Sequence, residues 1–202
     1  MRFPSRLWFA IIGVAALTLV TYSVAQGQAG WTNRGNIDHT NITQNVAGDI
    51  HVEGKIDGGS IVTLTSTAGS ITIDGKIDSG SQVRLNAAGD IRIGQVGLPG
   101  DKKIDGGSIV LAIAGGQITL GNKIDGGSRV SMRAKNGISI GDKIDGSSVV
   151  KLCTTTGKIR IQGKIDQVLT EVDYWPSGSL IVGGGIQRGT VRANQQIACN
   201  WK

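Results

Sequence analysis

The most conspicuous side chains that could do chemistry form a repeated lysine–aspartate pair. The tripeptide Lys-Ile-Asp occurs six times, at intervals of 20 to 27 residues. Because the isoleucine points to the opposite side of a strand from its neighbours, both charges of each copy face solvent. The resulting charged ladder consists of Lys55, Asp57, Lys76, Asp78, Lys103, Asp105, Lys123, Asp125, Lys143, Asp145, Lys164 and Asp166.

Two interpretations of the charged ladder are open. A regular charged surface can engage a polymer or a cell-wall glycan. The structural interpretation is favoured, because each aspartate precedes a glycine-rich corner, and its carboxylate can accept hydrogen bonds from the backbone amides of that corner. Calcium binding by the aspartate row is disfavoured, since a lysine stands two residues before every repeat aspartate and the glycine-rich nonapeptide of calcium-loaded β-rolls is absent.

Catalytic and metal-binding constellations are poorly supported. His39 and His51 are the only histidines, and neither has a cysteine or a second histidine at metal-ligand spacing. The repeat serines, such as Ser60 and Ser81, occupy equivalent corners and not one singular site. We therefore expect a protein that is not an enzyme and has no metal or cofactor. A β-helix polysaccharide lyase or hydrolase is the alternative, and it would need converging carboxylates in a cleft.

Basic residues are concentrated in the later repeats. Residues 129–164 contain eight basic and two acidic side chains. A surface of one sign attracts polymers of the opposite sign, so this region is a candidate site for an anionic glycan or lipid headgroup, with a solvated face as the alternative. Outside the ladder, the predicted basic patch comprises Arg129, Arg133, Lys135, Lys151, Lys158 and Arg160.

Two further features are singular. Cys153 and Cys199 are too few for a disulfide-dense scaffold, but export permits one disulfide between them; the alternative is a free, buried Cys153. The interval between Lys76 and Lys103 is 27 residues long and contains an insertion at 95–101. We expect this loop to bulge from a corner, and with Asp101 as its one titratable side chain a neutral insertion is favoured over a binding loop.

An internal repeat defines the elements that position these residues. Each unit reads Lys-Ile-Asp-Gly-Gly-Ser-x-Val-x-Leu, then small or polar residues, then Gly-x-Ile-x-Ile. Three stretches of period two are typical of short strands with one buried face. The return of each residue type after about 20 residues predicts an all-β, single-domain parallel β-solenoid (β-helix) of about seven to eight coils of 20–21 residues, with capped ends. A propeller blade needs about 40 residues or more.

The repeat also predicts the core. Three inward columns of aliphatic side chains would fill a narrow interior without aromatics, which suits a chain with 39% hydrophobic but only 4% aromatic residues, and the 32 glycines would supply corners. The columns are Ile56, Ile77, Ile104, Ile124, Ile144 and Ile165; Val62, Val83, Val110, Val130 and Val150; and Ile73, Ile93, Leu120, Ile140 and Ile161.

The ends of the chain differ from the repeats. Residues 1–25 combine Arg2 and Arg6 with an uncharged apolar run and a final Ser23-Val24-Ala25, which predicts a cleavable signal peptide and export to the periplasm, the cell surface or the medium. An uncleaved anchor is the alternative. We expect an N-terminal cap in 26–35, solenoid repeats in 36–186 and a C-terminal cap or tail in 187–202. Aromatics interpreted as caps are Trp31, Tyr174, Trp175 and Trp201.

The segments 48–54, 69–73 and 89–93 follow the pattern Gly-Asp-Ile-x-Ile or a close variant of it. In this respect residues 36–186 resemble bacterial secreted β-solenoid repeat proteins of the adhesin type. The resemblance implies a parallel β-helix, export and surface association. Together with the repeats, it favours a non-enzymatic exported protein with an adhesive, matrix or envelope-structural role, binding an anionic polysaccharide or another cell-surface component. A self-assembling fibre subunit, formed by end-to-end contact of monomers, is a further alternative; nucleic acid is not an expected partner.

Overall fold

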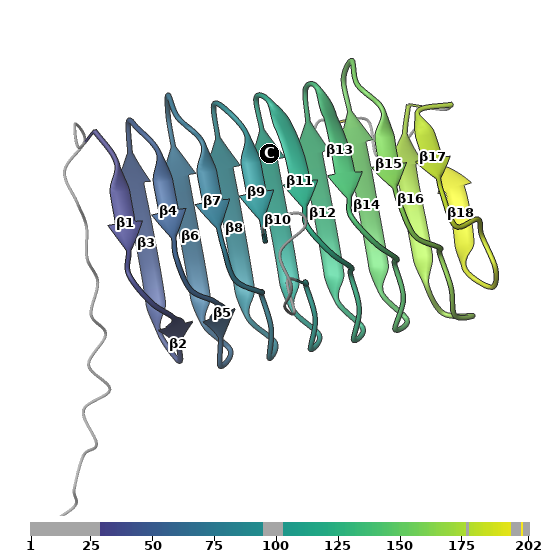
Figure 1. Cartoon of the computed structure of the whole chain (residues 1–202), viewed down its shortest axis with the longest axis horizontal. Coiled ribbons are helices and arrows are strands. Elements are labelled where there is room, and N and C mark those ends of the chain that lie inside the picture. The colour runs from purple at the N-terminus through teal and green to yellow at the C-terminus, as the bar shows by residue number, and fades with distance from the viewer. Residues whose placement is uncertain (1–28, 95–102, 177, 195–198, 200–202) are drawn as a thin grey trace, which may run out of the picture.

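The computed structural model describes residues 29–94, 103–176, 178–194 and 199. Within these ranges every regular element is a β-strand, and the strands pair in parallel from coil to coil (Figure 1). The chain forms a β-solenoid of about eight turns, so the predicted fold class is confirmed. The predicted signal peptide at 1–25, the insertion at 95–101 and Trp201 lie outside the described residues. No helix in the described part of the chain is long and apolar enough to cross a membrane.

Two eight-stranded parallel sheets form the main sides of the solenoid. The short-strand sheet has strands of three or four residues: β1 (Trp31–Asn33), β4 (Ile50–Val52), β7 (Ile71–Ile73), β9 (Ile91–Ile93), β11 (Gln117–Leu120), β13 (Gly137–Ile140), β15 (Ile159–Ile161) and β17 (Leu180–Val182). The long-strand sheet has strands of four to six residues: β3 (Asn41–Val46), β6 (Ile61–Ser66), β8 (Gln82–Ala87), β10 (Ile109–Ala114), β12 (Arg129–Ala134), β14 (Val149–Thr154), β16 (Glu171–Trp175) and β18 (Thr190–Ala193).

The Lys-Ile-Asp tripeptides form a third, narrower side. Only β2 (Ile37–Asp38) and β5 (Ile56–Asp57) qualify as strands there. In the later coils the isoleucine alone makes a parallel bridge to its counterpart one turn away, from Ile56 through to Ile186. Each coil therefore passes from the third side to the long-strand sheet and then to the short-strand sheet.

The interior consists of stacked aliphatic side chains. All three predicted columns are buried, and the register of the sheets stacks their members on one another. The long strands continue two residues further than the repeat suggested and add an inward column among residues that the repeat gives only as small or polar. Its members are small after the first coil, and Ser66 Oγ donates a 2.7 Å hydrogen bond to the Gly48 carbonyl. The column contains Val46, Ser66, Ala87, Ala114, Ala134 and Thr154.

The glycine-rich corners are positive-φ turns closed by hydrogen bonds. Gly126 and Gly127 have φ values of 62° and 72°, a region that suits glycine best. Asp125 Oδ1 accepts a 2.7 Å hydrogen bond from the Gly126 amide, and Ser128 Oγ donates one of 2.7 Å to the Asp125 carbonyl. The Ser60 hydroxyl closes its corner in the same way, at 2.6 Å from the Asp57 carbonyl, whereas the buried Ser108 hydroxyl has no partner among the described residues.

The C-terminal coils differ from the cap that the sequence suggested. Tyr174 and Trp175 lie in β16, which pairs with β14 on one side and β18 on the other, so these aromatics belong to a coil and do not lie beyond the last one. Regular stacking continues into the predicted tail 187–202, because β18 extends the long-strand sheet to Ala193.

Candidate functional site

The charges of the ladder are paired within their own coils. Lys123 Nζ lies 2.6 Å from Asp125 Oδ2 and Lys164 Nζ lies 2.7 Å from Asp166 Oδ2, with equivalent pairs in the other four copies. The second oxygen of the carboxylate accepts a hydrogen bond from the next backbone amide, as Asp145 Oδ1 does from the Gly146 amide at 2.6 Å. The charges of the ladder are therefore used in ion pairs and hydrogen bonds that stabilise the corner of each coil. This favours the structural interpretation of the ladder.

These contacts lower the pKa of several ladder carboxyls. Hydrogen bonds from Lys55, Ser79 and the Gly58 amide hold the pKa of Asp57 well below its ordinary value of 3.8. Arg188 and then Lys164 lower the pKa of Asp166 in the same way. At Asp78 and Asp125, desolvation raises the pKa, but the hydrogen bonds from the paired lysine and the corner amide outweigh it, and the net shift is downward.

A pH dependence of stability follows from these shifts. A carboxyl whose pKa is lower in the folded than in the unfolded chain contributes stability above the unfolded value, and this contribution is lost as the pH falls through the folded value. We expect the free energy of unfolding to be flat from pH 7 to about pH 5 and to decline below about pH 4. Urea unfolding followed by circular dichroism at several pH values measures this free energy of unfolding. The double variant Asp57→Asn, Asp166→Asn should show a smaller decline, and an equal decline would contradict the assignment.

The predicted basic patch is divided between two faces of the solenoid. Arg129, Arg133 and Lys151 project outward from β12 and β14 of the long-strand sheet, whereas Arg160 projects from β15 of the short-strand sheet. Lys135 and Lys158 lie at the corners between these sheets, and Lys158 Nζ donates to the Gly178 carbonyl at 3.3 Å. The structure therefore does not assemble the six residues into a single site.

One face nevertheless gathers unpaired cations, including one that the sequence analysis missed. Arg84 projects outward from β8 in the same row as Ser131 and Lys151. We call the outer surface of the long-strand sheet over β8, β10, β12 and β14 the cationic face; its cations are Arg84, Arg129, Arg133 and Lys151. Arg84 stands between Val83 and Leu85, the inward residues of its repeat, and this position in the sequence indicates that its side chain points outward.

The cations of this face lack carboxylate partners. Within the described ranges no Asp or Glu oxygen lies within ion-pair distance of any of the four, and the next strand, β16, shows the contrast. There Arg192, from β18, lies 3.3 Å from Glu171 and 3.1 Å from Asp173. Arg129 and Arg133 lie four residues apart on β12, about 13 Å at 3.3 Å per residue. Lys151 lies one coil away, in register with Ser131 between them.

A shallow depression lies at one end of this face, where the long strands turn toward the short-strand sheet. Its volume is about 440 Å³, and its lining includes Asn86, Ile113, Arg133, Lys135 and Thr155. Two cations, an amide and a hydroxyl around an open hollow can bind an anionic group by charge and hydrogen bonds. Lys135, although at a corner, thus joins Arg133 as the sequence analysis proposed.

The short-strand sheet has a second hollow, of about 480 Å³, but its charges are satisfied. His51 Nε2 lies 2.8 Å from Asp74 Oδ2, and Arg92 Nη2 lies 3.2 Å from Asp90 Oδ2. Within the part of the chain that the structure describes, no group of three His, Cys, Asp or Glu side chains is arranged to hold a metal ion.

The segment Gly137-Ile138-Ser139-Ile140-Gly141 matches the Gly-x-Ser-x-Gly pattern of hydrolase nucleophiles. That motif works at a sharp turn between a strand and a helix. Here Ser139 lies within β13, and its strand neighbours in register are Thr119 and Arg160, neither of which can act as a paired general base. The match therefore has no catalytic context.

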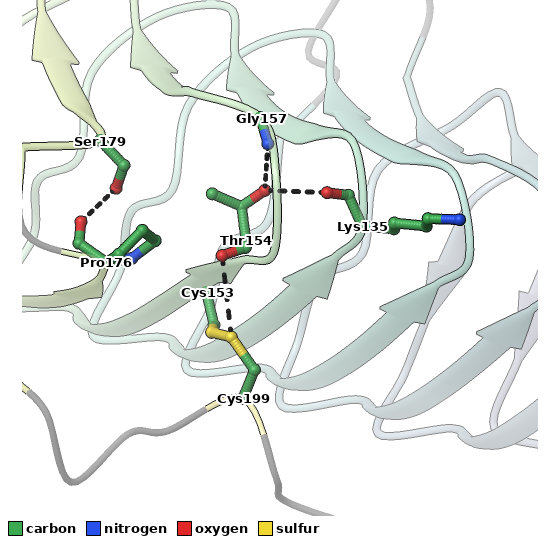
Figure 2. Close-up of a disulfide and its surroundings, with 7 residues drawn as sticks. All are labelled: Lys135, Cys153, Thr154, Gly157, Pro176, Ser179 and Cys199. Atoms are coloured by element: carbon green, nitrogen blue, oxygen red, sulfur yellow. Dashed lines mark hydrogen bonds between the residues drawn. A yellow bond between two sulfur atoms is a disulfide. The ribbon is translucent and has the colours of Figure 1, made fainter.

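Cys153 and Cys199 are joined in a disulfide (Figure 2), with Cα atoms 5.7 Å apart. Cys153 is fully buried in β14, and Cys199 Sγ lies 3.8 Å from the Thr154 carbonyl oxygen. The bond fixes residue 199 on the outward side of β14, because Cys153 is in register with the outward Arg133. Residue 199 therefore lies at the edge of the cationic face, two coils inside the C-terminal edge of the long-strand sheet, since β14 is followed by β16 and β18. The pairing is the one that the sequence analysis proposed, and the described residues contain no free thiol.

Comparison of the chain with protein-family models, with curated proteins and with solved structures found no match.

Proposed function

We propose that this protein is a non-enzymatic, exported β-solenoid with an adhesive or envelope-structural role, which holds an anionic glycan on its cationic face. One observation carries the proposal: Arg84, Arg129, Arg133 and Lys151 project from one flat sheet without any carboxylate partner in the described ranges. Long charged side chains that repel one another are relieved when an anionic ligand lies among them.

Two features of the rod support a polymer as the ligand. The cations lie on three of four successive coils, β8, β12 and β14, and coils about 4.8 Å apart present them along the axis as well as across it. The adjoining hollow at Arg133 and Lys135 is open and shallow, which suits one anionic group of a chain better than an enclosed small molecule. The non-enzymatic part of the proposal is supported by the ladder, whose carboxylates are all engaged at corners.

Removal of the cations tests the proposal. The variant Arg84→Gln, Arg129→Gln, Arg133→Gln, Lys151→Gln is expected to lose at least about tenfold in affinity for alginate, an anionic polysaccharide, because four exposed charges that attract the polymer are gone. Biolayer interferometry at low salt measures this, and binding by the unchanged protein should weaken as salt is added.

The matched control removes the same charge from other places. The variant Arg34→Gln, Arg92→Gln, Lys158→Gln, Arg160→Gln alters four cations outside the cationic face, two of them from the predicted basic patch. It should bind alginate nearly as tightly as the unchanged protein. Equal losses in both variants would mean that net charge and not this face drives the binding, and no binding of alginate by the unchanged protein would refute the proposal.

A further inference from the structure

The strand β10 is apolar on both of its sides. Its inward residues Val110, Ala112 and Ala114 are buried in the core, as in every coil. Its outward residues are Ile109, Leu111 and Ile113, and Ile109 remains 45% exposed. The core does not require these three side chains, because the inward residues already complete its columns.

Arginines lie on both sides of this aliphatic row. In register with it, β8 presents Arg84 beside Leu111, and β12 presents Arg129 and Arg133 beside Ile109 and Ile113. On β14 the aliphatic character continues at Val149, next to Arg129 in register, while Lys151 adds a further cation. The centre of the cationic face is therefore amphipathic: a floor of aliphatic groups surrounded by long cationic side chains.

We propose that the cationic face docks on a bilayer surface that contains anionic lipid. The inference goes beyond the proposed function: it gives the same cations a second ligand, the phosphates of lipid headgroups, and adds a role for the aliphatic row. The arginine side chains are long enough to lie along the aliphatic row and reach past it. Their guanidinium groups would pair with lipid phosphates while Ile109, Leu111 and Ile113 contact the acyl boundary.

The aliphatic row distinguishes a bilayer from a hydrated glycan. A soluble anionic polysaccharide gains from the cations but leaves isoleucine and leucine side chains in water, whereas a lipid surface offers both phosphate and hydrocarbon. Glu171 and Asp173 lie on the adjacent strand β16, in register with Val149 and Lys151, and both carboxylates are engaged by Arg192. They mark the limit of the cationic face on this side. Trp175, partly buried on the same strand, is a residue type enriched at membrane interfaces.

Vesicle sedimentation tests the inference with the full mature protein. The protein should sediment with vesicles of phosphatidylcholine and phosphatidylglycerol and not with phosphatidylcholine alone. The variant Ile109→Thr, Leu111→Thr, Ile113→Thr should bind the mixed vesicles at least about tenfold more weakly, since burial of three aliphatic side chains is lost. Threonine suits an exposed strand position, and circular dichroism verifies the fold. The control Ile181→Thr, Ile186→Thr changes exposed isoleucines on the other two sides of the solenoid and should bind as the unchanged protein does.

The possible outcomes separate the two proposals. Undiminished vesicle binding by the threonine variant would overturn the docking inference, since charge alone would then account for binding. Binding of alginate without binding of either vesicle type would overturn it as well, while the proposed function stands. If the unchanged protein binds neither alginate nor vesicles, both proposals fail. Loss of vesicle binding by the threonine variant with retained alginate binding would establish the apolar contribution.

Discussion

Replacing Ile124 by alanine is expected to lower the free energy of unfolding by about 2–5 kcal/mol. Ile124 is fully buried and lies between Ile104 and Ile144, to which it is joined by parallel bridges. The backbone hydrogen bonds of these bridges, such as that from the Asp125 amide to the Ile104 carbonyl at 2.9 Å, fix the coil spacing. The neighbouring coils therefore cannot collapse onto the missing atoms, and a cavity remains. Urea unfolding followed by circular dichroism measures the loss.

The control for this substitution is Ile61→Ala. Ile61 begins β6 on the outward side and is 48% exposed, so the same atoms are removed without a core cavity. Its cost should be less than about 1 kcal/mol, because little apolar area leaves the interior. A similar loss at both positions would mean that the isoleucine column does not form the core.

Replacing either disulfide cysteine by alanine is expected to cost up to about 4 kcal/mol. The bond closes a loop with a sequence separation of 46 residues, and in the chain-entropy description a crosslink of that size restricts the unfolded chain by this amount. Cys199→Ala is the more direct variant, because Cys153 is also fully buried and its replacement additionally changes the packing of β14. Thermal and urea unfolding of the oxidised proteins measure the loss.

A cycle of variants tests the crosslink itself. The double variant Cys153→Ala, Cys199→Ala should be no less stable than Cys153→Ala alone, since the bond can be lost only once. Addition of a reducing agent should destabilise the unchanged protein and leave the double variant unaffected. Additive losses from the two single changes would show that the cysteines act independently and not as a pair.

The architecture was accessible from the sequence because the repeat returns each residue type to the same place. A column such as Ile104, Ile124 and Ile144 follows directly from intervals of 20 residues. The length of the long strands was not accessible. Ala114 and Ala134 fall among the small or polar residues that follow the x-Val-x-Leu strand of the repeat, yet they face inward at the ends of β10 and β12. Small size there reflects limited space beside a turn and does not signal a loop.

The candidate site was only partly predictable, because the face on which a charge lies depends on its position in the repeat and not on the local density of charge. Arg133 and Arg160 are both in the basic stretch, but the first lies on the long-strand sheet and the second on the short-strand sheet. Arg84 lies outside that stretch, yet it shares a face with Arg133. Alignment of the repeats before counting charges would have grouped these residues correctly.

The parallel stacking fixes the distances between groups along the axis of the solenoid. Each coil advances the rod by about 4.8 Å, so the axial distance between two outward groups is a whole number of such steps. Arg84 and Arg129 lie on β8 and β12, two steps apart, and no side-chain change can alter that spacing. Gaining or losing one complete repeat would lengthen or shorten the rod by one coil and leave the spacing of all the other coils unchanged. A lineage carrying such a chain can therefore adjust reach by copying whole units, whereas extra residues between two coils leave it unchanged, as the 27-residue interval between Lys76 and Lys103 does with β8 and β10 still paired in register.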